Sequence, residues 1–330
     1  MRIHIQNPDN DPLFDFSYAM WDVAAARAPD ISQGHDVSLG VTPADFLAGM
    51  RDAEALVCDA SVIRALFPPL DQGPAPHLKL IFLTNAGLDW LAPFDWLPAG
   101  VILMNNRGTH AAKSGEFAIM SILMLANRIP AMITNQRHGQ WRKLWGSVLH
   151  GRTLTVVGLG TLGGATAEHA ALFGMRVTGV RANPAPHPSC ETVIGIDALD
   201  DALPHSEFLV LACPLTDTTR GLMTRQRLES LPSGAGLVNI GRGGLLDQDA
   251  LCDLLDNGHL SGAVLDVFTP EPIPPGHRLW TTPNLIISPH TSADDPATYN
   301  PRSLDIFLNN LRAFRNGDPL PNQFDIVRGY

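Results

Sequence analysis

The chain has 330 residues, of which 45% are hydrophobic, and its 33 acidic and 23 basic side chains give a formal net charge of −10. This length exceeds one typical hydrophobic core and predicts two domains. The acidic balance disfavours nucleic acid as a partner, because phosphate binding needs concentrated basic side chains. Four scattered cysteines without C-x-x-C spacing predict neither a disulfide framework nor a cysteine-based zinc site.

The amino terminus runs directly into a strand-like segment at residues 3–6 and lacks the apolar core of a signal peptide. The longest apolar run, residues 117–126, has about half the length of a membrane span. We therefore expect a cytoplasmic protein that is neither exported nor inserted into a membrane.

The first part of the chain alternates short apolar strands with helical or proline-rich connections, which is the pattern of an α/β domain. The predicted strands cover residues 3–6, 55–58, 78–84 and 101–104. A long helix is predicted next, at residues 109–127, and we interpret it as a connector between two domains.

A glycine-rich loop follows. The sequence Val-Val-Gly-Leu-Gly-Thr-Leu-Gly places Gly158, Gly160 and Gly163 in the G-x-G-x-x-G spacing. The loop lies between a predicted strand at 152–157 and a predicted helix at 161–174, which is the context that this motif needs. The glycines permit a tight turn and close approach of the backbone to a pyrophosphate, and the N–H groups of the helix face the anion. We therefore expect a bound dinucleotide.

The remaining predicted elements complete an α/β architecture. Further strands are predicted at 176–180, 208–213, 236–240, 262–267 and 285–288. Together with the strand before the glycine loop they form a doubly wound parallel sheet of the Rossmann type. The last predicted helix, at 305–315, is expected to return to the first domain.

These elements divide the chain into two predicted domains. Residues 106–290 form the dinucleotide-binding Rossmann domain, and residues 1–105 with 291–330 form a discontinuous, flavodoxin-like α/β substrate domain. Ligands of such sheets bind outside the carboxyl ends of the strands, which predicts a site in the cleft between the domains.

The residue that closes the second Rossmann strand predicts the cofactor. NAD-binding domains carry a carboxylate there that bonds the ribose 2′-hydroxyl, whereas this chain has Arg181. A guanidinium can pair with a 2′-phosphate, so NADP(H) is favoured. NAD(H) remains the alternative if Arg181 is only a solvated surface residue.

Three later segments each carry a polar side chain after a predicted strand. They are Asn-Ile-Gly-Arg-Gly-Gly with Arg242, Asp-Val-Phe-Thr-Pro-Glu-Pro with Glu271, and Ser-Pro-His-Thr-Ser with His290. An imidazolium is well suited to donate a proton to a carbonyl near neutral pH. A carboxylate bonded to its other nitrogen would fix the tautomer, and a guanidinium would hold a carboxylate and polarise the ketone. We predict these roles for His290, Glu271 and Arg242.

The order of the segments resembles the D-isomer-specific 2-hydroxyacid dehydrogenases over nearly the whole chain. The glycine loop, the arginine segment, the Asp-Val-Phe-x-x-Glu-Pro run and the Pro-His pair occur in that family's order, with 29 residues from Arg242 to Glu271 and 19 from Glu271 to His290. The resemblance implies reduction of a small 2-keto acid to a D-2-hydroxy acid. Glyoxylate, hydroxypyruvate and a larger keto acid are the candidate substrates.

The resemblance also implies contacts beyond the catalytic trio. The backbone amides of Ala86 and Gly87 would hold the substrate carboxylate, and the side chain of Asn85, which departs from the family's small residue, would enter the pocket. Asp266 would contact the nicotinamide carboxamide. The implied substrate contacts are Asn85, Ala86, Gly87, Arg242 and His290. The implied cofactor contacts are Gly158, Gly160, Thr161, Leu162, Gly163, Arg181, Cys213, Pro214, Thr219, Ile240, Gly241, Arg242, Asp266 and His290.

Partners and metals follow from weaker signals. Trp141 and Trp145 precede the first Rossmann strand, in a region that packs against a second subunit in relatives, so the resemblance implies a homodimer. Core or surface packing explains the two tryptophans nearly as well. The other histidines, including His110, His138 and His277, lack paired metal-ligand spacing, so we predict no metal and assign them no role.

A second hypothesis is a dinucleotide-sensing protein without significant turnover. Such a protein would resemble the C-terminal-binding-protein corepressors, which share this fold and keep residues comparable to Arg242, Glu271 and His290. The acidic chain without partner-binding tails favours the enzyme.

Overall fold

The computed structural model describes residues 1–8, 15–67 and 75–329. The chain divides into two compact units, Met1–Thr109 with Asp295–Tyr330, and His110–Asp294. Both boundaries lie four residues later than those expected from the sequence, which were 105/106 and 290/291.

The first unit contains a five-stranded parallel sheet with the strand order β2-β1-β3-β4-β5, which is the flavodoxin-like order. Its strands are β1 (Arg2–Gln6), β2 (Asp36–Gly40), β3 (Ala55–Cys58), β4 (Leu80–Leu83) and β5 (Ile102–Met104). The sequence did not predict β2, because this edge strand alternates exposed and half-buried residues and presents a weak apolar pattern.

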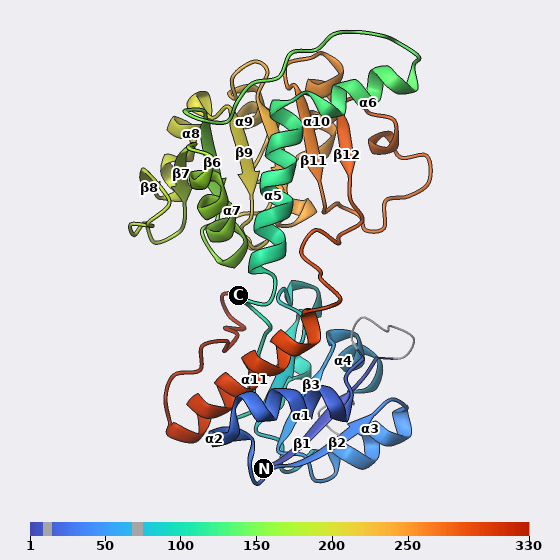
Figure 1. Ribbon diagram of the computed structural model, residues 1–330. Helices are drawn as coiled ribbons and strands as arrows, with labels where there is room; N and C mark the ends of the chain where they lie inside the picture. The colour runs from blue at the N-terminus through green and yellow to red at the C-terminus, as the bar shows by residue number, and fades with distance from the viewer. Residues whose placement is uncertain (9–14, 68–74, 330) are drawn as a thin grey trace. The chain divides into compact units, whose positions relative to one another are not determined.

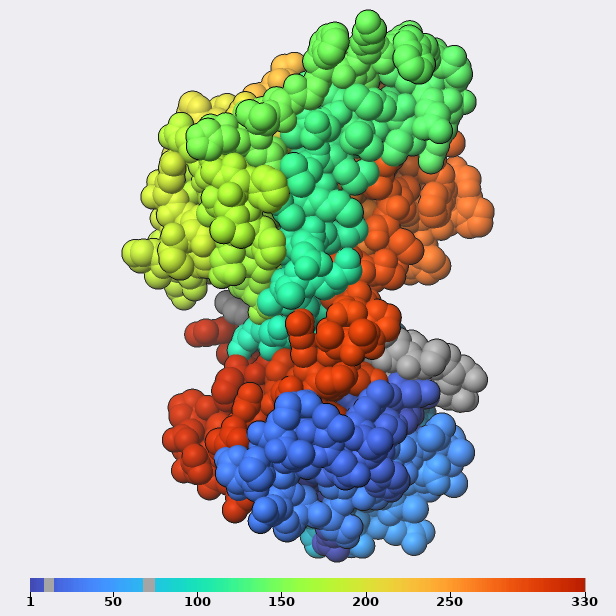
Figure 2. Space-filling model, in the orientation of Figure 1, coloured from blue at the N-terminus to red at the C-terminus, as the bar shows by residue number. Residues whose placement is uncertain are grey.

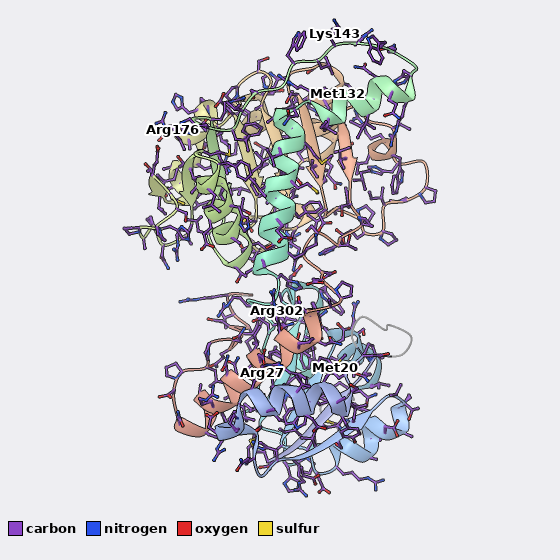
Figure 3. The ribbon with its side chains drawn as sticks, in the orientation of Figure 1. Met20, Arg27, Met132, Lys143, Arg176 and Arg302 are labelled. Atoms are coloured by element: carbon purple, nitrogen blue, oxygen red, sulfur yellow. The ribbon has the colours of Figure 1, made fainter. Side chains whose placement is uncertain are left out.

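Helices cover both faces of this sheet. They are α1 (Tyr18–Arg27), α2 (Pro29–Ser32), α3 (Pro43–Met50), α4 (Ala60–Leu66) and α11 (Tyr299–Asn316), with short 3-10 turns η3 (Asp89–Leu91) and η4 (Phe94–Trp96). The C-terminal helix α11 packs Phe307 against Phe82 of β4, with ring centroids 5.7 Å apart. On its exposed side, Arg27 of α1 pairs with Asp305 at 2.7 Å (Figure 3).

The second unit contains a seven-stranded parallel sheet with the order β12-β11-β10-β9-β6-β7-β8. Its strands are β6 (Thr153–Val157), β7 (Arg176–Val180), β8 (Thr192–Ile194), β9 (Phe208–Leu211), β10 (Gly236–Asn239), β11 (Gly262–Leu265) and β12 (Leu285–Ile287). The order is that of a Rossmann sheet with one additional strand, and it reverses between β6 and β9. The prediction of a doubly wound Rossmann sheet beside a flavodoxin-like sheet is confirmed, and only the edge strand β8 was missed.

Two layers of helices enclose this second sheet (Figure 1). One face carries α5 (Ala111–Ala126), α6 (Ile129–Arg137) and α7 (Thr161–Leu172). The other carries α8 (Leu199–Ala202), α9 (Arg225–Glu229) and α10 (Gln248–Asp256), with 3-10 turns η5 (Ile196–Ala198), η6 (Leu203–His205), η7 (Gly243–Leu245) and η8 (Arg278–Trp280). Helices α5 and α7 approach closely at Gly115, which has no side chain. A Cβ there would lie only 3.1 Å from the Cβ of Ala165.

The segment between α6 and β6 has no regular secondary structure from residue 140 to residue 149. It runs along the outside of the second unit, where Lys143 marks its course (Figures 2 and 3). Trp141 is 95% exposed and Trp145 is 81% exposed, so neither tryptophan belongs to a core.

Among the described residues, no single helix is both long and apolar enough to cross a membrane. Helices α5 and α6 together have the length and the apolar composition of a membrane span, but they are bent by 65° at the break between them. The predicted location of the protein in the cell stays a prediction.

Candidate active site

The predicted site residues of the second unit come from loops that follow the strands of one parallel sheet. Gly158 follows β6, Arg181 follows β7, Arg242 follows β10, Asp266 follows β11 and His290 follows β12. Because parallel strands end at the same edge of a sheet, segments more than a hundred residues apart reach one edge.

The glycine loop shows why Gly158 and Gly163 cannot carry side chains. Gly158 has a φ of +95°, and a Cβ there would lie 2.7 Å from the backbone of Cys213. A Cβ at Gly163 would lie 1.7 Å from the carbonyl oxygen of Gly158. Packing within the protein therefore explains both glycines.

Gly160 has a different reason to be glycine. Its φ of −78° and ψ of −155° are open to other residues, and a Cβ there would meet nothing within 4 Å. It precedes helix α7, which has no side-chain cap at this end and presents N–H groups suited to an anion. A missing side chain in open space beside these groups fits the close approach of a dinucleotide pyrophosphate, with Thr161 and Leu162 opening the helix.

The loop after β9 lies next to the glycine loop, because β9 and β6 are neighbours in the sheet and Gly158 packs against the backbone of Cys213. Burial raises the pKa of the Cys213 thiol to about 11, so this residue is a packing group at neutral pH. The hydroxyl of Thr219 donates to the carbonyl of Pro214 at 2.7 Å and accepts from the N–H of Thr216 at 2.8 Å. Thr219 therefore closes the loop that the resemblance assigns to the cofactor.

Arg242 occupies a turn that buried groups hold in shape. Asn239, which is fully buried at the end of β10, accepts from the N–H of Gly241 at 3.1 Å and donates to the carbonyl of Arg242 at 3.0 Å. Ile240 is buried beneath the turn. Sequence reasoning gave Asn239 no role, although a polar residue that ends a buried strand is a signal for one.

Glu271 and His290 form the central pair of the site. Nδ1 of His290 lies 2.8 Å from Oε2 of Glu271, with 50% and 34% of the two side chains exposed. The other carboxylate oxygen, Oε1, accepts from the N–H of Phe268 at 2.6 Å. Glu271 is therefore held at one oxygen by the backbone and orients the imidazole with the other, while the ring stays accessible to a substrate.

The local charges raise the pKa of His290 above its ordinary value. The hydrogen bond to Glu271 is the main cause; burial and the Arg242 guanidinium act in the opposite direction, and the charge of Asp266 adds to the rise. Burial raises the pKa of Glu271, but the bonds from His290 and Phe268 and the charge of Arg242 outweigh it, and the net shift is downward. The pair is thus set up as imidazolium and carboxylate, which is the form that donates a proton.

Asp266 holds the segment that follows His290. It is 2% exposed, and its carboxylate accepts from the N–H of Thr291 at 3.0 Å, from the N–H of Ser292 at 3.1 Å and from the Ser292 hydroxyl at 2.5 Å. His290 itself has a φ of +57°, a left-handed conformation that neighbouring contacts must support. The contact of Asp266 with the nicotinamide carboxamide stays a prediction.

The predicted substrate loop belongs to the first unit, where Asn85, Ala86 and Gly87 follow β4. The Oδ1 atom of Asn85 accepts from the N–H of Ala60 at 2.7 Å, so its side-chain carbonyl supports the start of α4. The carbonyl of Ala86 accepts from the side-chain amide of Asn105 at 2.7 Å. Because this oxygen is used within the first unit, the expected entry of the Asn85 side chain into a pocket concerns only its amide nitrogen, and it stays a prediction.

The described residues contain no group of three or more His, Cys, Asp or Glu side chains that could hold a metal ion. The chemistry of the trio does not require one, since the guanidinium of Arg242 can polarise a carbonyl.

Comparisons with known proteins show the family. A family model described as the NAD-binding domain of D-isomer-specific 2-hydroxyacid dehydrogenases matches residues 119–292. The human glyoxylate reductase/hydroxypyruvate reductase is 30% identical over 313 residues, which cover 92% of this chain and 94% of that protein.

The chain belongs to the D-isomer-specific 2-hydroxyacid dehydrogenases.

Solved structures of this family share the fold. A dehydrogenase from Xanthobacter autotrophicus Py2, in complex with NADPH and MES, superposes with a TM-score of 0.81 at 28% identity and covers 99% of both chains. An NADPH-dependent glyoxylate/hydroxypyruvate reductase from Sinorhizobium meliloti, in complex with NADP and sulfate, gives a TM-score of 0.79 at 27% identity over the full length of both chains. Membership makes this 2-hydroxyacid dehydrogenase an oxidoreductase that acts on a CH–OH group and its keto counterpart with a dinucleotide.

Gly160, which faces open space, and Gly163, which is packed against the backbone, predict different effects of substitution. Gly160→Val should weaken dinucleotide binding by about tenfold or more, roughly 1.4 kcal/mol, and leave the melting temperature nearly unchanged. Gly163→Ala should instead destabilise the protein by about 1–3 kcal/mol through overpacking. Cofactor titration and thermal unfolding of both variants measure this contrast, and unchanged cofactor affinity in Gly160→Val would contradict the assignment.

Glu271→Gln should shift the pH dependence of reduction. Reduction uses the protonated ring, so kcat/KM is high below the pKa of His290 and falls as the pH rises through it. Loss of the carboxylate lowers this pKa and should move the alkaline limb to lower pH by roughly one unit. The profile of kcat/KM against pH measures the shift, with the exposed Glu229→Gln as the control; an unmoved limb would argue against the pair.

Proposed function

We propose that this protein reduces a small 2-keto acid to a D-2-hydroxy acid, with NADPH as the preferred cofactor and His290 as the proton donor. The observation that carries the proposal is the 2.8 Å contact between His290 and Glu271, at the sheet edge that also bears the glycine loop. Glyoxylate and hydroxypyruvate are the first substrates to test, because relatives carry these names.

The proposed reaction divides between the cofactor and the chain. When bound, the reduced nicotinamide supplies the hydride that C2 of the keto acid receives. His290, bonded to Glu271 through Nδ1, donates the proton on Nε2 to the carbonyl oxygen, and the C=O group becomes CH–OH. In the reverse direction the neutral ring accepts that proton.

Arg242 has the complementary role in the proposal. Its guanidinium would pair with the substrate carboxylate and counter the negative charge that develops on the carbonyl oxygen. Nη1 of Arg242 donates to the carbonyl of Gly241 at 2.8 Å, which supports a defined orientation of the group. The backbone of the loop at Asn85, Ala86 and Gly87 is the proposed second holder of the carboxylate.

A panel of 2-keto acids tests the proposal directly. NADPH should be consumed with at least one of glyoxylate, hydroxypyruvate and larger 2-keto acids, and His290→Ala should lower kcat by about 10²–10⁴-fold with cofactor affinity nearly intact. Loss of NADPH absorbance measures the rate. Tight NADPH binding without turnover across the panel would favour the dinucleotide-sensing alternative, and substantial activity in His290→Ala would mean that another group supplies the proton.

Arg181 carries the preference for NADPH in this proposal. It begins the loop after β7, where residues 181–190 contain no carboxylate that would repel a 2′-phosphate. Arg181→Asp removes a charge-assisted contact and adds repulsion, so the NADPH/NADH selectivity should fall by about 10–100-fold. Steady-state kinetics with both cofactors measure the ratio, and unchanged selectivity would remove Arg181 from the site.

We also propose a homodimer held through the extended segment before β6. Trp141, Trp145 and Val148 are among the most exposed apolar side chains of the described residues, at 95%, 81% and 77%, and large exposed apolar side chains in one segment favour a protein partner. The wild-type mass by light scattering should be twice that of the chain. Trp141→Ser with Trp145→Ser should shift it toward the monomer, while Trp280→Ser, at a 49% exposed tryptophan elsewhere, should not.

A further inference from the structure

His110 is a largely buried histidine at the start of helix α5, and no role was assigned to it from the sequence. It is the first residue of the second unit and the N-cap residue of α5, with 12% of its side chain exposed. Its Nδ1 atom lies 3.1 Å from the carbonyl oxygen of Ala293 and 3.7 Å from Oδ1 of Asp294. His110 thus contacts the point where the chain leaves the second unit.

The same short segment carries the catalytic histidine. Residues 291 and 292, which follow His290, are bonded to Asp266. Nδ1 of His110 lies within hydrogen-bond distance of the carbonyl oxygen of residue 293, and the carboxylate of residue 294 is the farther neighbour of the same atom. Three consecutive residues after His290 are therefore hydrogen-bonded to two side chains, that of Asp266 after β11 and that of His110 at the start of α5.

We propose that His110 is a positioning residue for His290, because it anchors the segment after His290 to the start of α5 through the carbonyl of Ala293. This inference rests on the proposed role of His290 as proton donor. The left-handed backbone of His290 requires support from its neighbours. The bond from His110 to Ala293 adds support beyond the two residues that Asp266 holds, and its loss should let the imidazole move relative to Glu271.

The electrostatics of His110 suit this task. Burial is the main cause that lowers its pKa below the ordinary value, and the charges of Arg242 and His290 lower it further, against the opposite effects of Ala293 and Asp294. His110 is therefore neutral at a pH where His290 is protonated. A neutral ring with its hydrogen on Nδ1 donates to the Ala293 carbonyl without adding a third cation to those of His290 and Arg242.

Two substitutions separate this anchoring bond from mere occupancy of the site. His110→Ala removes the donor, whereas His110→Asn keeps one, since the amide nitrogen of asparagine occupies nearly the position of Nδ1. The matched control is His138→Asn in the same unit. Nδ1 of the exposed His138 likewise contacts a carbonyl oxygen, that of Thr134, at 2.8 Å. Its turnover should match the wild type.

The expected result is a loss of rate that the conservative variant restores. His110→Ala should lower kcat about 10–100-fold, as expected when a catalytic group is misplaced by an ångström or less, with the Kd for NADPH within about twofold. His110→Asn should recover kcat to within about threefold of wild type. Wild-type kcat in His110→Ala, or an equal loss in the Ala and Asn variants with both folded, would overturn the proposal.

A second measurement does not depend on turnover. The pKa of His290, measured by NMR on histidine-labelled protein without substrate, should fall in His110→Ala as the Glu271 contact loosens, and should return in His110→Asn. An unchanged pKa of His290 in His110→Ala would overturn the positioning role even if the enzyme is active. Failure of the keto-acid panel, together with the expected pKa changes, would instead reject the proposed reaction and retain the anchor.

Discussion

The parallel arrangement of seven strands is the constraint on which the site of the second unit depends. Strands that run in one direction end at one edge, and each of the loops that leave this edge brings a different chemical group. The glycine loop, the arginine turn and the histidine segment lie far apart in the sequence, and they reach the same edge because β6, β10 and β12 belong to one sheet. No local sequence property could place them on one edge.

The groups at this edge are held by buried polar side chains rather than by the regular elements themselves. Asn239 shapes the turn of Arg242, and Asp266 fixes the backbone after His290. Each is almost fully buried and bonded, which is the condition under which a buried polar group stabilises a unique structure. The result is a half-exposed imidazole on a rigid support, a combination suited to proton transfer.

The charged groups around His290 act on its pKa in different directions. Glu271 is close and bonded, Asp266 is buried and committed to backbone N–H groups, and Arg242 opposes both by lowering the pKa of the ring. His110 is kept neutral by its burial. The site therefore concentrates one proton on one ring, although two histidines, an arginine and three carboxylates lie in its neighbourhood.

The sequence by itself determined the two sheets and the family, because regular apolar strands and the glycine spacing are local patterns that need no partner to be recognised, and it predicted the roles of Arg242, Glu271 and His290. It missed β2 and β8, since edge strands bury few apolar residues and leave a weak pattern. Only the tertiary structure decided that Gly160 faces open space, that Asn85 supports a helix start, and that His110 and Asp266 hold the segment behind His290. These are contacts between side chains and distant backbone, and their geometry exists only once the strands have packed into their order.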